Sequence, residues 1–351
     1  MAIPPVLHRL LTAAGPSGYE TAPAAAFRDA AAEFAEVTTD VMGSVWAKVP
    51  GTAGGRSLAI IGHIDEIGLI VTHIDDDGFL YVIGVGGWDP PNLVGQRVDV
   101  LTKDGVVPGV IGKKPIHLIK PDQRDKGVKL EDLHIDIAAK DGEEARGRVR
   151  IGDVAVITGE PVELPNDRAI SRSMDNRLGC YVAYEAARLV AEAGGAPGDV
   201  VAVAAVQEEI TFGGSRTTAY ALEPDAAIVV DVTFATDQPG IDVKELGKHE
   251  LGSGPVLERG SVLNPAIFEG LHAAALAKEL PFTVSSSAGR TGTDADAVHL
   301  SRAGVPTGLI GLPLRYMHSP VEMVQISDVQ AAAEIIAAYA LGLAPDASFA
   351  R

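Results

Sequence analysis

The second half of this chain alternates short apolar runs with longer segments of helical spacing, and this alternation limits the possible folds more than any other feature. Strands are predicted at residues 200–206, 226–230 and 307–312, and helices at residues 176–193, 214–221, 265–280, 294–303 and 327–340. Nearer the N-terminus, a helix is expected at residues 22–36, ahead of apolar runs at 58–61 and 69–71. Such alternation is typical of a mostly parallel sheet with helices on both faces. The sequence therefore predicts an α/β fold.

The stretch from residue 75 to residue 161 has a different pattern, with short β-branched runs between glycines. Strands are predicted there at residues 82–85, 97–101, 106–111 and 154–158. This pattern favours a small β-rich module inserted into the α/β fold. We therefore expect one domain made of residues 1–74 and 162–351, and an inserted β-rich domain at residues 75–161.

Charge and composition exclude several classes of protein. With 351 residues, of which 46% are hydrophobic, the chain can bury a large core. Its 47 acidic and 29 basic residues give a net charge of −18, which repels nucleic-acid phosphates. Its apolar runs are shorter than the roughly 20 residues that cross a bilayer, and no secretion signal is recognisable. With Cys180 as its only cysteine, we expect a cytoplasmic protein without nucleic-acid or membrane partners.

His63 and Asp65 follow the apolar run at residues 58–61 almost directly. In extended backbone, side chains two residues apart point to the same side, so both can face one site. An imidazole and a carboxylate in this arrangement can serve a metal ion and its surroundings. The alternative is an ordinary hydrogen-bonded pair at the end of a strand.

Glu208 and Glu209 come right after the predicted strand at residues 200–206. Adjacent carboxylates at the end of an apolar strand repel each other and lose hydration, which is unfavourable unless a cation or a proton compensates. Because successive side chains diverge, one carboxylate can bind a metal ion while the other acts as a general base.

Asp231 and His318 follow the other predicted strands, at residues 226–230 and 307–312. Open α/β sheets bind their ligands at the carboxyl ends of their strands, so these side chains are expected to converge. Asp175 lies next to the predicted start of a helix, where it is either a further ligand or a helix N-cap.

The candidate ligands thus comprise two histidines, His63 and His318, and three carboxylates, without a thiolate. The carboxylates come from Asp175, Asp231 and one of the two adjacent glutamates. This set of donors suits zinc, cobalt or manganese. Five ligands are too many for a single tetrahedral catalytic zinc that keeps an open position. They suit two divalent ions that share one bridging carboxylate.

These residues resemble those of the TET-type aminopeptidases, which include glutamyl, leucyl and deblocking aminopeptidases. Similar segments occur along most of the chain, at residues 62–68, 86–90, 95–98, 112–117, 173–179, 207–213, 231–233, 292–294 and 313–322. The resemblance implies a zinc-peptidase-like, mostly parallel sheet flanked by helices, with an inserted small β-barrel-like dimerisation domain.

The resemblance also implies a role for each candidate residue. Two divalent ions, zinc or cobalt with manganese as a further option, would be held by His63, Asp175, Glu209, Asp231 and His318. His63 and Asp231 would bind one ion, Glu209 and His318 the other, and Asp175 would bridge them. Glu208 would act as the general base, and Asp65 would orient His63.

The implied activity is the removal of N-terminal residues from short or unfolded peptides. Gly292, Thr293 and Asp294 would help to line the pocket for the N-terminal side chain. Similar enzymes form homo-oligomers built from dimers, up to dodecamers. The resemblance fixes neither the preferred N-terminal residue nor the physiological metal.

Two other functions remain open. Some members of this family have been labelled endoglucanases, and an endo-glycosidase would need only two carboxylates, such as Glu208 and Asp65, without a metal. A catalytically silent scaffold that binds peptides is the alternative outside enzymes.

Overall fold

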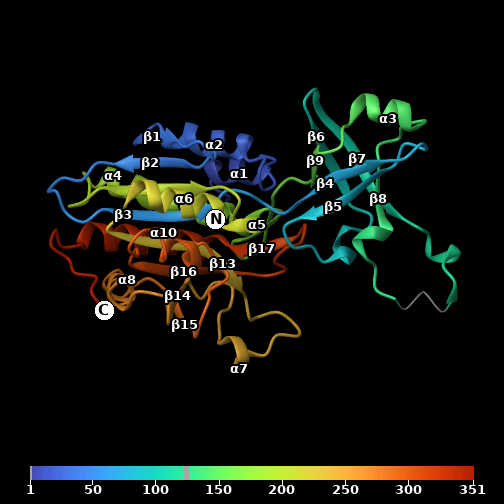
Figure 1. The fold of residues 1–351 in the computed structure, drawn as a ribbon. Helices are drawn as coiled ribbons and strands as arrows, with labels where there is room; N and C mark the ends of the chain where they lie inside the picture. Colours follow the sequence, from blue (N-terminus) through green and yellow to red (C-terminus); the bar gives the residue numbers. More distant parts are fainter. Residues whose placement is uncertain (1, 122–125) are drawn as a thin grey trace.

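A mixed sheet of eight strands forms the centre of the larger part of the molecule (Figure 1). The computed structural model describes residues 2–121 and 126–351. The strand order is β1-β2-β12-β3-β13-β16-β14-β15. The strands are β1 (Glu36–Thr39), β2 (Val45–Val49), β3 (Leu58–His63), β12 (Val200–Ala205), β13 (Ala226–Phe234), β14 (Val256–Gly260), β15 (Thr283–Ser287) and β16 (Thr307–Leu314). The four central strands, from β12 to β16, are parallel, whereas β2 and β14 pair with this group in antiparallel fashion.

Helices cover both faces of this sheet, as the alternation of the sequence predicts. One face carries α1 (Pro5–Thr12), α2 (Thr21–Ala31), α4 (Met174–Glu192), α8 (Pro265–Ala277) and α10 (Ile326–Gly342). The other face carries α6 (Gly213–Leu222) and α9 (Ala295–Val298). In β3, Ile60 packs into the core on the first face and Ile61 into the core on the second, and both are fully buried. Each such side chain contributes about 1.5–3 kcal/mol to stability, which explains why this strand is apolar throughout.

A closed barrel of six strands lies beside the sheet (Figure 1). Its strands, in spatial order, are β4 (Gly68–Ile74), β5 (Leu80–Val85), β8 (Leu133–Asp136), β7 (Gly105–Lys113), β6 (Arg97–Thr102) and β9 (Val154–Ile157). Helix α3 (Gly142–Arg148) and the short helices η1 (Pro90–Leu93), η2 (Ile116–Leu118) and η4 (Leu130–Asp132) belong to the same stretch of chain. Leu80, Val100 and Ile135 are fully buried in its separate core. Closure of the barrel removes the unpaired strand edges that an open sheet of this size would expose.

The remaining elements connect the barrel and the site to the main sheet. A small antiparallel sheet contains β10 (Val162–Leu164), β11 (Arg168–Ser171) and β17 (Glu322–Gln325). Two one-turn helices, α5 (Glu208–Thr211) and α7 (Val243–Leu246), follow β12 and β13 respectively. Among the described residues, no helix has both the length and the apolar character needed to cross a membrane.

The structure confirms the expected fold class, an α/β sheet with an inserted barrel. The barrel begins with Gly68, before residue 75, where the insertion was expected to start. The division of the chain into one domain of residues 1–74 and 162–351 and another of residues 75–161 stays a prediction.

Several predicted elements have different ends in the structure. The helix expected at residues 22–36 ends at Ala31, because residues 36–39 pair with β2 as an edge strand. The helix expected at residues 294–303 is confined to Ala295–Val298, after which the chain turns. Strand β13 continues past residue 230 to Phe234 because its parallel partner β16 also continues, to Leu314. Asp231 consequently lies within a strand and not after its end.

Candidate metal centre

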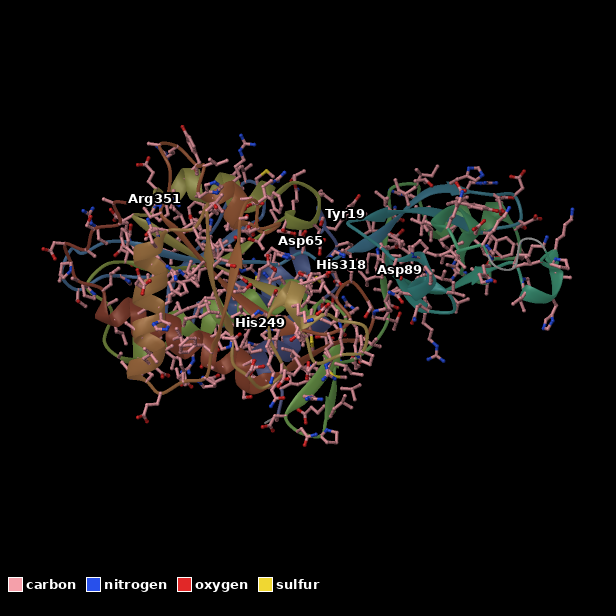
Figure 2. The ribbon with its side chains drawn as sticks, turned by 90° about the horizontal axis from the view of Figure 1, so that it is seen from below. Tyr19, Asp65, Asp89, His249, His318 and Arg351 are labelled. Carbon is pink, nitrogen blue, oxygen red and sulfur yellow. The ribbon has the colours of Figure 1, made fainter. Side chains whose placement is uncertain are left out.

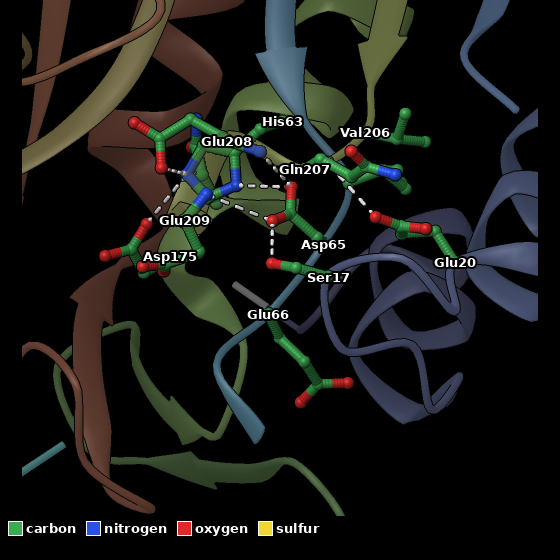
Figure 3. Close-up of polar contacts among 12 residues, drawn as sticks. Ser17, Glu20, His63, Asp65, Glu66, Asp175, Val206, Gln207, Glu208 and Glu209 are labelled. Atoms are coloured by element: carbon green, nitrogen blue, oxygen red, sulfur yellow. Dashed lines mark hydrogen bonds and ion pairs between the residues drawn. The ribbon is translucent and has the colours of Figure 1, made fainter. Parts of the chain in front are cut away.

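Asp65 connects the end of β3 to the start of α5 (Figure 3). Its Oδ1 lies 3.3 Å from Nδ1 of His63, the last residue of β3. The same carboxylate accepts hydrogen bonds from the backbone amides of Glu208 and Glu209, both at 3.1 Å, and from the hydroxyl of Ser17. Asp65 is fully buried. It therefore fixes the imidazole of His63 relative to the two glutamates that follow β12.

Asp175 lies between the two candidate histidines. Its Oδ1 is 3.1 Å from Nε2 of His63, and its Oδ2 is 3.3 Å from Nε2 of His318. Ser173 occupies the N-cap position of α4, and the peptide bond from Asp175 to Asn176 is cis. Asp175 is thus not the N-cap of α4, which was the alternative to a ligand role. Each of its two oxygens instead faces a different imidazole.

Three further carboxylates surround these histidines. Oδ1 of Asp231 lies 3.9 Å and Oε2 of Glu208 3.6 Å from Nε2 of His63. Oε1 of Glu209 lies 3.4 Å from Nε2 of His318. The donor atoms fall into two groups, each within 4.8 Å, which comprise His63, Asp175 and Glu209 and, separately, His63, Glu208 and Asp231. All five candidate ligands predicted from the sequence therefore meet at one place.

The contacts of the Nδ1 atoms indicate the tautomer of each histidine. Nδ1 of His318 lies 2.8 Å from the backbone carbonyl oxygen of Gly87, an acceptor, so this nitrogen carries the proton. Nδ1 of His63 faces the Asp65 carboxylate in the same way. In the neutral form of each histidine, Nε2 would therefore present its lone pair to the centre of the cluster, as metal-binding imidazoles do.

The electrostatics of the cluster favour a cation or a proton at its centre. Burial, reinforced by Asp231 and opposed by His63, raises the pKa of Glu208 to about 10. Burial also raises the pKa of Asp231 well above its ordinary value and raises that of Glu209. Burial acts in the same sense on Asp175, but its contacts with His318 and His63 lower its pKa. Carboxylates crowded in this way favour a bound cation or a proton.

The chemistry of the donors fits divalent metal ions. Imidazole nitrogens and carboxylate oxygens, without a sulfur atom, suit borderline or harder ions such as zinc, cobalt and manganese. The thiol of Cys180 is buried elsewhere in the core, and burial raises its pKa, so it is not a candidate ligand or nucleophile. The residues that could hold such ions are thus His63, Asp175, Glu208, Glu209, Asp231 and His318.

Left-handed backbone is concentrated around this cluster. Non-glycine residues with positive φ next to the candidate ligands are Ser173, Gln207, Phe212, Tyr316 and His318. Such conformations are unfavourable by about 1–3 kcal/mol each and persist where the surrounding structure holds them, often at functional sites. They turn the chain sharply just where side chains must point inward.

Glu322 is a residue of this site that sequence reasoning missed. Its carboxylate accepts hydrogen bonds from the backbone amides of His318, at 2.9 Å, and Asp175, at 3.1 Å. It thereby ties together the two segments that carry Asp175 and His318. The resemblance includes residues 313–322 but assigns no role to Glu322. A carboxylate whose partners are backbone amides has no sequence pattern of its own.

Arg177 was also missed, and it supports the site from behind. Its guanidinium is fully buried and donates hydrogen bonds to the carbonyl oxygens of Ile64, at 2.5 Å, and Ala13, at 2.8 Å. It also pairs with Glu66 at 3.1 Å, and Glu66 pairs with Arg172 as well. Ile64 separates His63 from Asp65, so this network holds the backbone between them.

The three residues expected at the substrate pocket occupy different positions. Gly292 and Thr293 line a cavity of about 390 Å³ together with the candidate ligands. Asp294 is fully buried and is not among the residues lining that cavity. The Ser215 hydroxyl donates to its carboxylate at 2.5 Å. Asp294 therefore supports, from the interior, the loop that contains Gly292 and Thr293.

The profile of the M42 glutamyl aminopeptidase family matches residues 43–335, which is most of the chain. This protein belongs to the M42 glutamyl aminopeptidase family. The lysyl aminopeptidase of Pyrococcus furiosus is 35% identical over 332 residues, which cover 92% of both chains. The solved TET aminopeptidase of a marine sediment archaeon of the Thaumarchaeota is 35% identical, with a TM-score of 0.90 over 96% of each chain. The chain thus shares both sequence and fold with M42 metallo-aminopeptidases.

Other similar solved structures are named either as peptidases that form large assemblies or as an endoglucanase. The TET1 peptidase of Pyrococcus horikoshii is 29% identical, with a TM-score of 0.85 over 96% of this chain and 99% of its own. It can assemble into a tetrahedron or a large octahedral shell, and the related PhTET1-12s is a dodecamer. A Thermotoga maritima structure named endoglucanase is also 29% identical, with a TM-score of 0.76 over 95% of this chain and 96% of its own.

Proposed function

We propose that this protein is a metal-dependent aminopeptidase that removes N-terminal residues from short or unfolded peptides at a dinuclear metal centre. The observation that carries the proposal is the position of Asp175, whose two oxygens face the two histidines at 3.1 Å and 3.3 Å. A carboxylate in this position can bridge two ions. His63 and Asp231 would complete one set of ligands, and Glu209 and His318 the other.

The proposed metals are zinc or cobalt, with manganese as a further option. When bound, such a pair polarises the scissile carbonyl, lowers the pKa of water and stabilises negative charge on the carbonyl oxygen. The remaining steps belong to the side chains of this protein. The carboxylate of Glu208 lines the cavity beside the candidate ligands, where it can take a proton from the attacking water and deliver it to the leaving amine.

Asp65 is proposed as a positioning residue for this reaction. Its contact with Nδ1 of His63 keeps the Nε2 lone pair directed at the cluster. Its acceptance of the Glu208 amide hydrogen bond holds the proposed base at the start of α5. The carboxyl groups of Glu208 and Glu209 can then take different roles although the residues are adjacent.

The test combines metal analysis with activity. Dialysis against a chelator should abolish hydrolysis of leucine p-nitroanilide, and zinc or cobalt should restore it, with two ions bound per chain by mass spectrometry. Glu208→Gln should keep both ions but lose kcat by roughly 100-fold to 10,000-fold. A matched ligand variant, Asp231→Asn, should lose metal as well. Wild-type turnover by Glu208→Gln would remove Glu208 from the mechanism.

An endo-glycosidase is the second candidate, because a related structure is named endoglucanase. Such an enzyme would need Asp65 and Glu208 as its two carboxyl groups. Asp65 is fully buried and takes hydrogen bonds from Ser17 and two backbone amides, which leaves no room for a sugar. Hydrolysis of carboxymethylcellulose that persists with a chelator would favour the glycosidase. Absence of bound metal after dialysis would favour a silent scaffold that binds peptides.

The proposal extends to assembly and location. We expect a cytoplasmic homo-oligomer built from dimers, with the dodecamer as the expected state, because relatives form tetrahedral and dodecameric particles. The barrel is the proposed dimerisation module. Native mass spectrometry should give about twelve times the chain mass of 36.4 kDa. A monomer under the conditions of full activity would contradict this part of the proposal.

A further inference from the structure

The cavity that faces the candidate ligands has a wall of uncharged side chains. Six of its lining residues are the five candidate ligands and Glu208. Three large apolar side chains, Phe212, Phe234 and Met317, form part of the remaining wall, and three threonines, Val232 and Gly292 complete it. Within residues 2–121 and 126–351, no lysine, arginine, aspartate or glutamate belongs to this remaining wall.

The N-terminal residue of a substrate has to lie against this wall. An aminopeptidase places the first carbonyl group at its catalytic centre, and no residue precedes that carbonyl except the N-terminal one. The first side chain therefore occupies the part of the cavity that the ligands do not fill. Resting on the aminopeptidase function proposed above, we infer that this wall selects N-terminal residues with large uncharged side chains, such as leucine, methionine and phenylalanine, over acidic and basic residues.

The two arginines next to the wall segments at residues 291–293 and 317 contact carboxylates that do not line the cavity. Arg290 contacts Asp296 at 3.4 Å, and Arg315 contacts Asp237 at 2.5 Å. Among the described residues that line the cavity, no lysine or arginine would receive an acidic N-terminal side chain. A basic side chain would find only carboxylates that are engaged in the candidate metal centre. Transfer of an unpaired charge from water into such a cavity is unfavourable, whereas apolar side chains gain from contact with Phe212, Phe234 and Met317.

The net charge of the molecule adds only to the discrimination against acidic residues. A charge of −18 lowers the concentration of anionic substrates near the protein at low ionic strength. Acidic N-terminal residues are therefore expected to be the poorest substrates. This specificity would separate the protein from its lysyl relative in Pyrococcus furiosus and from the glutamyl activity in the name of its family.

The test measures kcat/KM of the full-length, zinc-loaded or cobalt-loaded protein on the p-nitroanilides of leucine, methionine, phenylalanine, lysine and glutamate. The leucine value should exceed the lysine and glutamate values on the order of 100-fold. Calorimetric binding of free leucine and free glutamate should give the same ranking without turnover. Equal values for leucine and either charged residue would overturn the inference and leave the aminopeptidase intact. Failure to hydrolyse any of these substrates with metal bound would overturn both proposals.

A charge added to the wall should change the ranking. Phe234 is 48% exposed at the end of β13, so a lysine is tolerated there. Phe234→Lys should raise the ratio of glutamate to leucine kcat/KM roughly fivefold. Leu276→Lys is the matched control, since Leu276 is 58% exposed on α8 and does not line the cavity. The inference fails if both variants shift the ratio equally. Met317→Lys is the second wall variant if Phe234→Lys does not fold.

Discussion

Replacement of Arg177 by methionine should strongly destabilise the protein, because a fully buried guanidinium would be removed from its acceptors. The side chain donates to the carbonyl oxygens of Leu10, Ala13 and Ile64 and pairs with Glu66. Methionine has a similar length but no donor. The three carbonyl groups would then remain buried without this partner.

The size of the effect follows from these contacts. Removal of one partner from a buried, hydrogen-bonded charge pair typically destabilises a protein by about 3–5 kcal/mol. Glu66 keeps its pairing with Arg172 in the variant, so the loss should fall within this range and not above it. The free energy of unfolding of a typical domain is about 5–15 kcal/mol. Arg177→Met should therefore still fold at low temperature, but it should unfold at a much lower urea concentration than the unsubstituted protein.

The assay is urea unfolding followed by circular dichroism, at one protein concentration for all variants. Arg216→Met is the matched control, since Arg216 is exposed and a surface substitution should change stability by less than about 0.5 kcal/mol. Arg177→Lys should also be destabilised, because an ammonium group cannot reproduce the planar set of donors. A loss below about 1 kcal/mol for Arg177→Met would refute the reasoning.

Three further changes test other parts of the structure. Glu322→Gln keeps one acceptor oxygen for two backbone amides, so zinc affinity should fall by about 10-fold to 100-fold in competition with a fluorescent chelator; an unchanged Kd would contradict this. Burial raises the pKa of Glu20 to about 7, above its unfolded value, so the folded state retains a proton that the unfolded state releases, and stability should fall as the pH rises towards 7. Glu20→Gln should reduce that fall in the urea midpoint, and an identical pH profile would exclude Glu20 as its source. In Gly62→Ala the new Cβ would lie 2.3 Å from the backbone of Gly179, so α4 must shift, and thermal unfolding should show a loss of about 1–3 kcal/mol.

The sequence predicts those parts of the fold whose signal lies in a single stretch of chain. The central strands are mostly apolar because both of their faces are covered, and Val200–Ala205 and Thr307–Leu314 are recognisable for that reason. Edge elements carry a weaker signal. Strand β1 has mostly exposed residues, and its first residue falls at the end of a predicted helix, because only the pairing with β2 makes this segment a strand.

The residues of the candidate site also fall into those that the sequence identifies and those that it does not. His63, Glu208 and Asp231 are recognisable because a polar side chain that interrupts or follows an apolar run is conspicuous. Glu322 and Arg177 are not, because their partners are backbone groups from distant segments. Periodicity reports which side chains are buried, but it does not report which carbonyl or amide group a buried charge will meet.

The hydrogen bond from Nδ1 of His318 to the backbone carbonyl oxygen of Gly87 joins the loop after β16 to the loop after β5, and Figure 2 shows His318 on the side of the sheet that faces the barrel. Gly87 lies in the loop after the barrel strand β5, whereas His318 lies in the loop after strand β16 of the main sheet. Because this carbonyl oxygen accepts from Nδ1, the loop that follows the barrel strand β5 helps to fix the orientation of the His318 ring. The position of the barrel relative to the sheet is thereby linked to the geometry of the candidate metal centre.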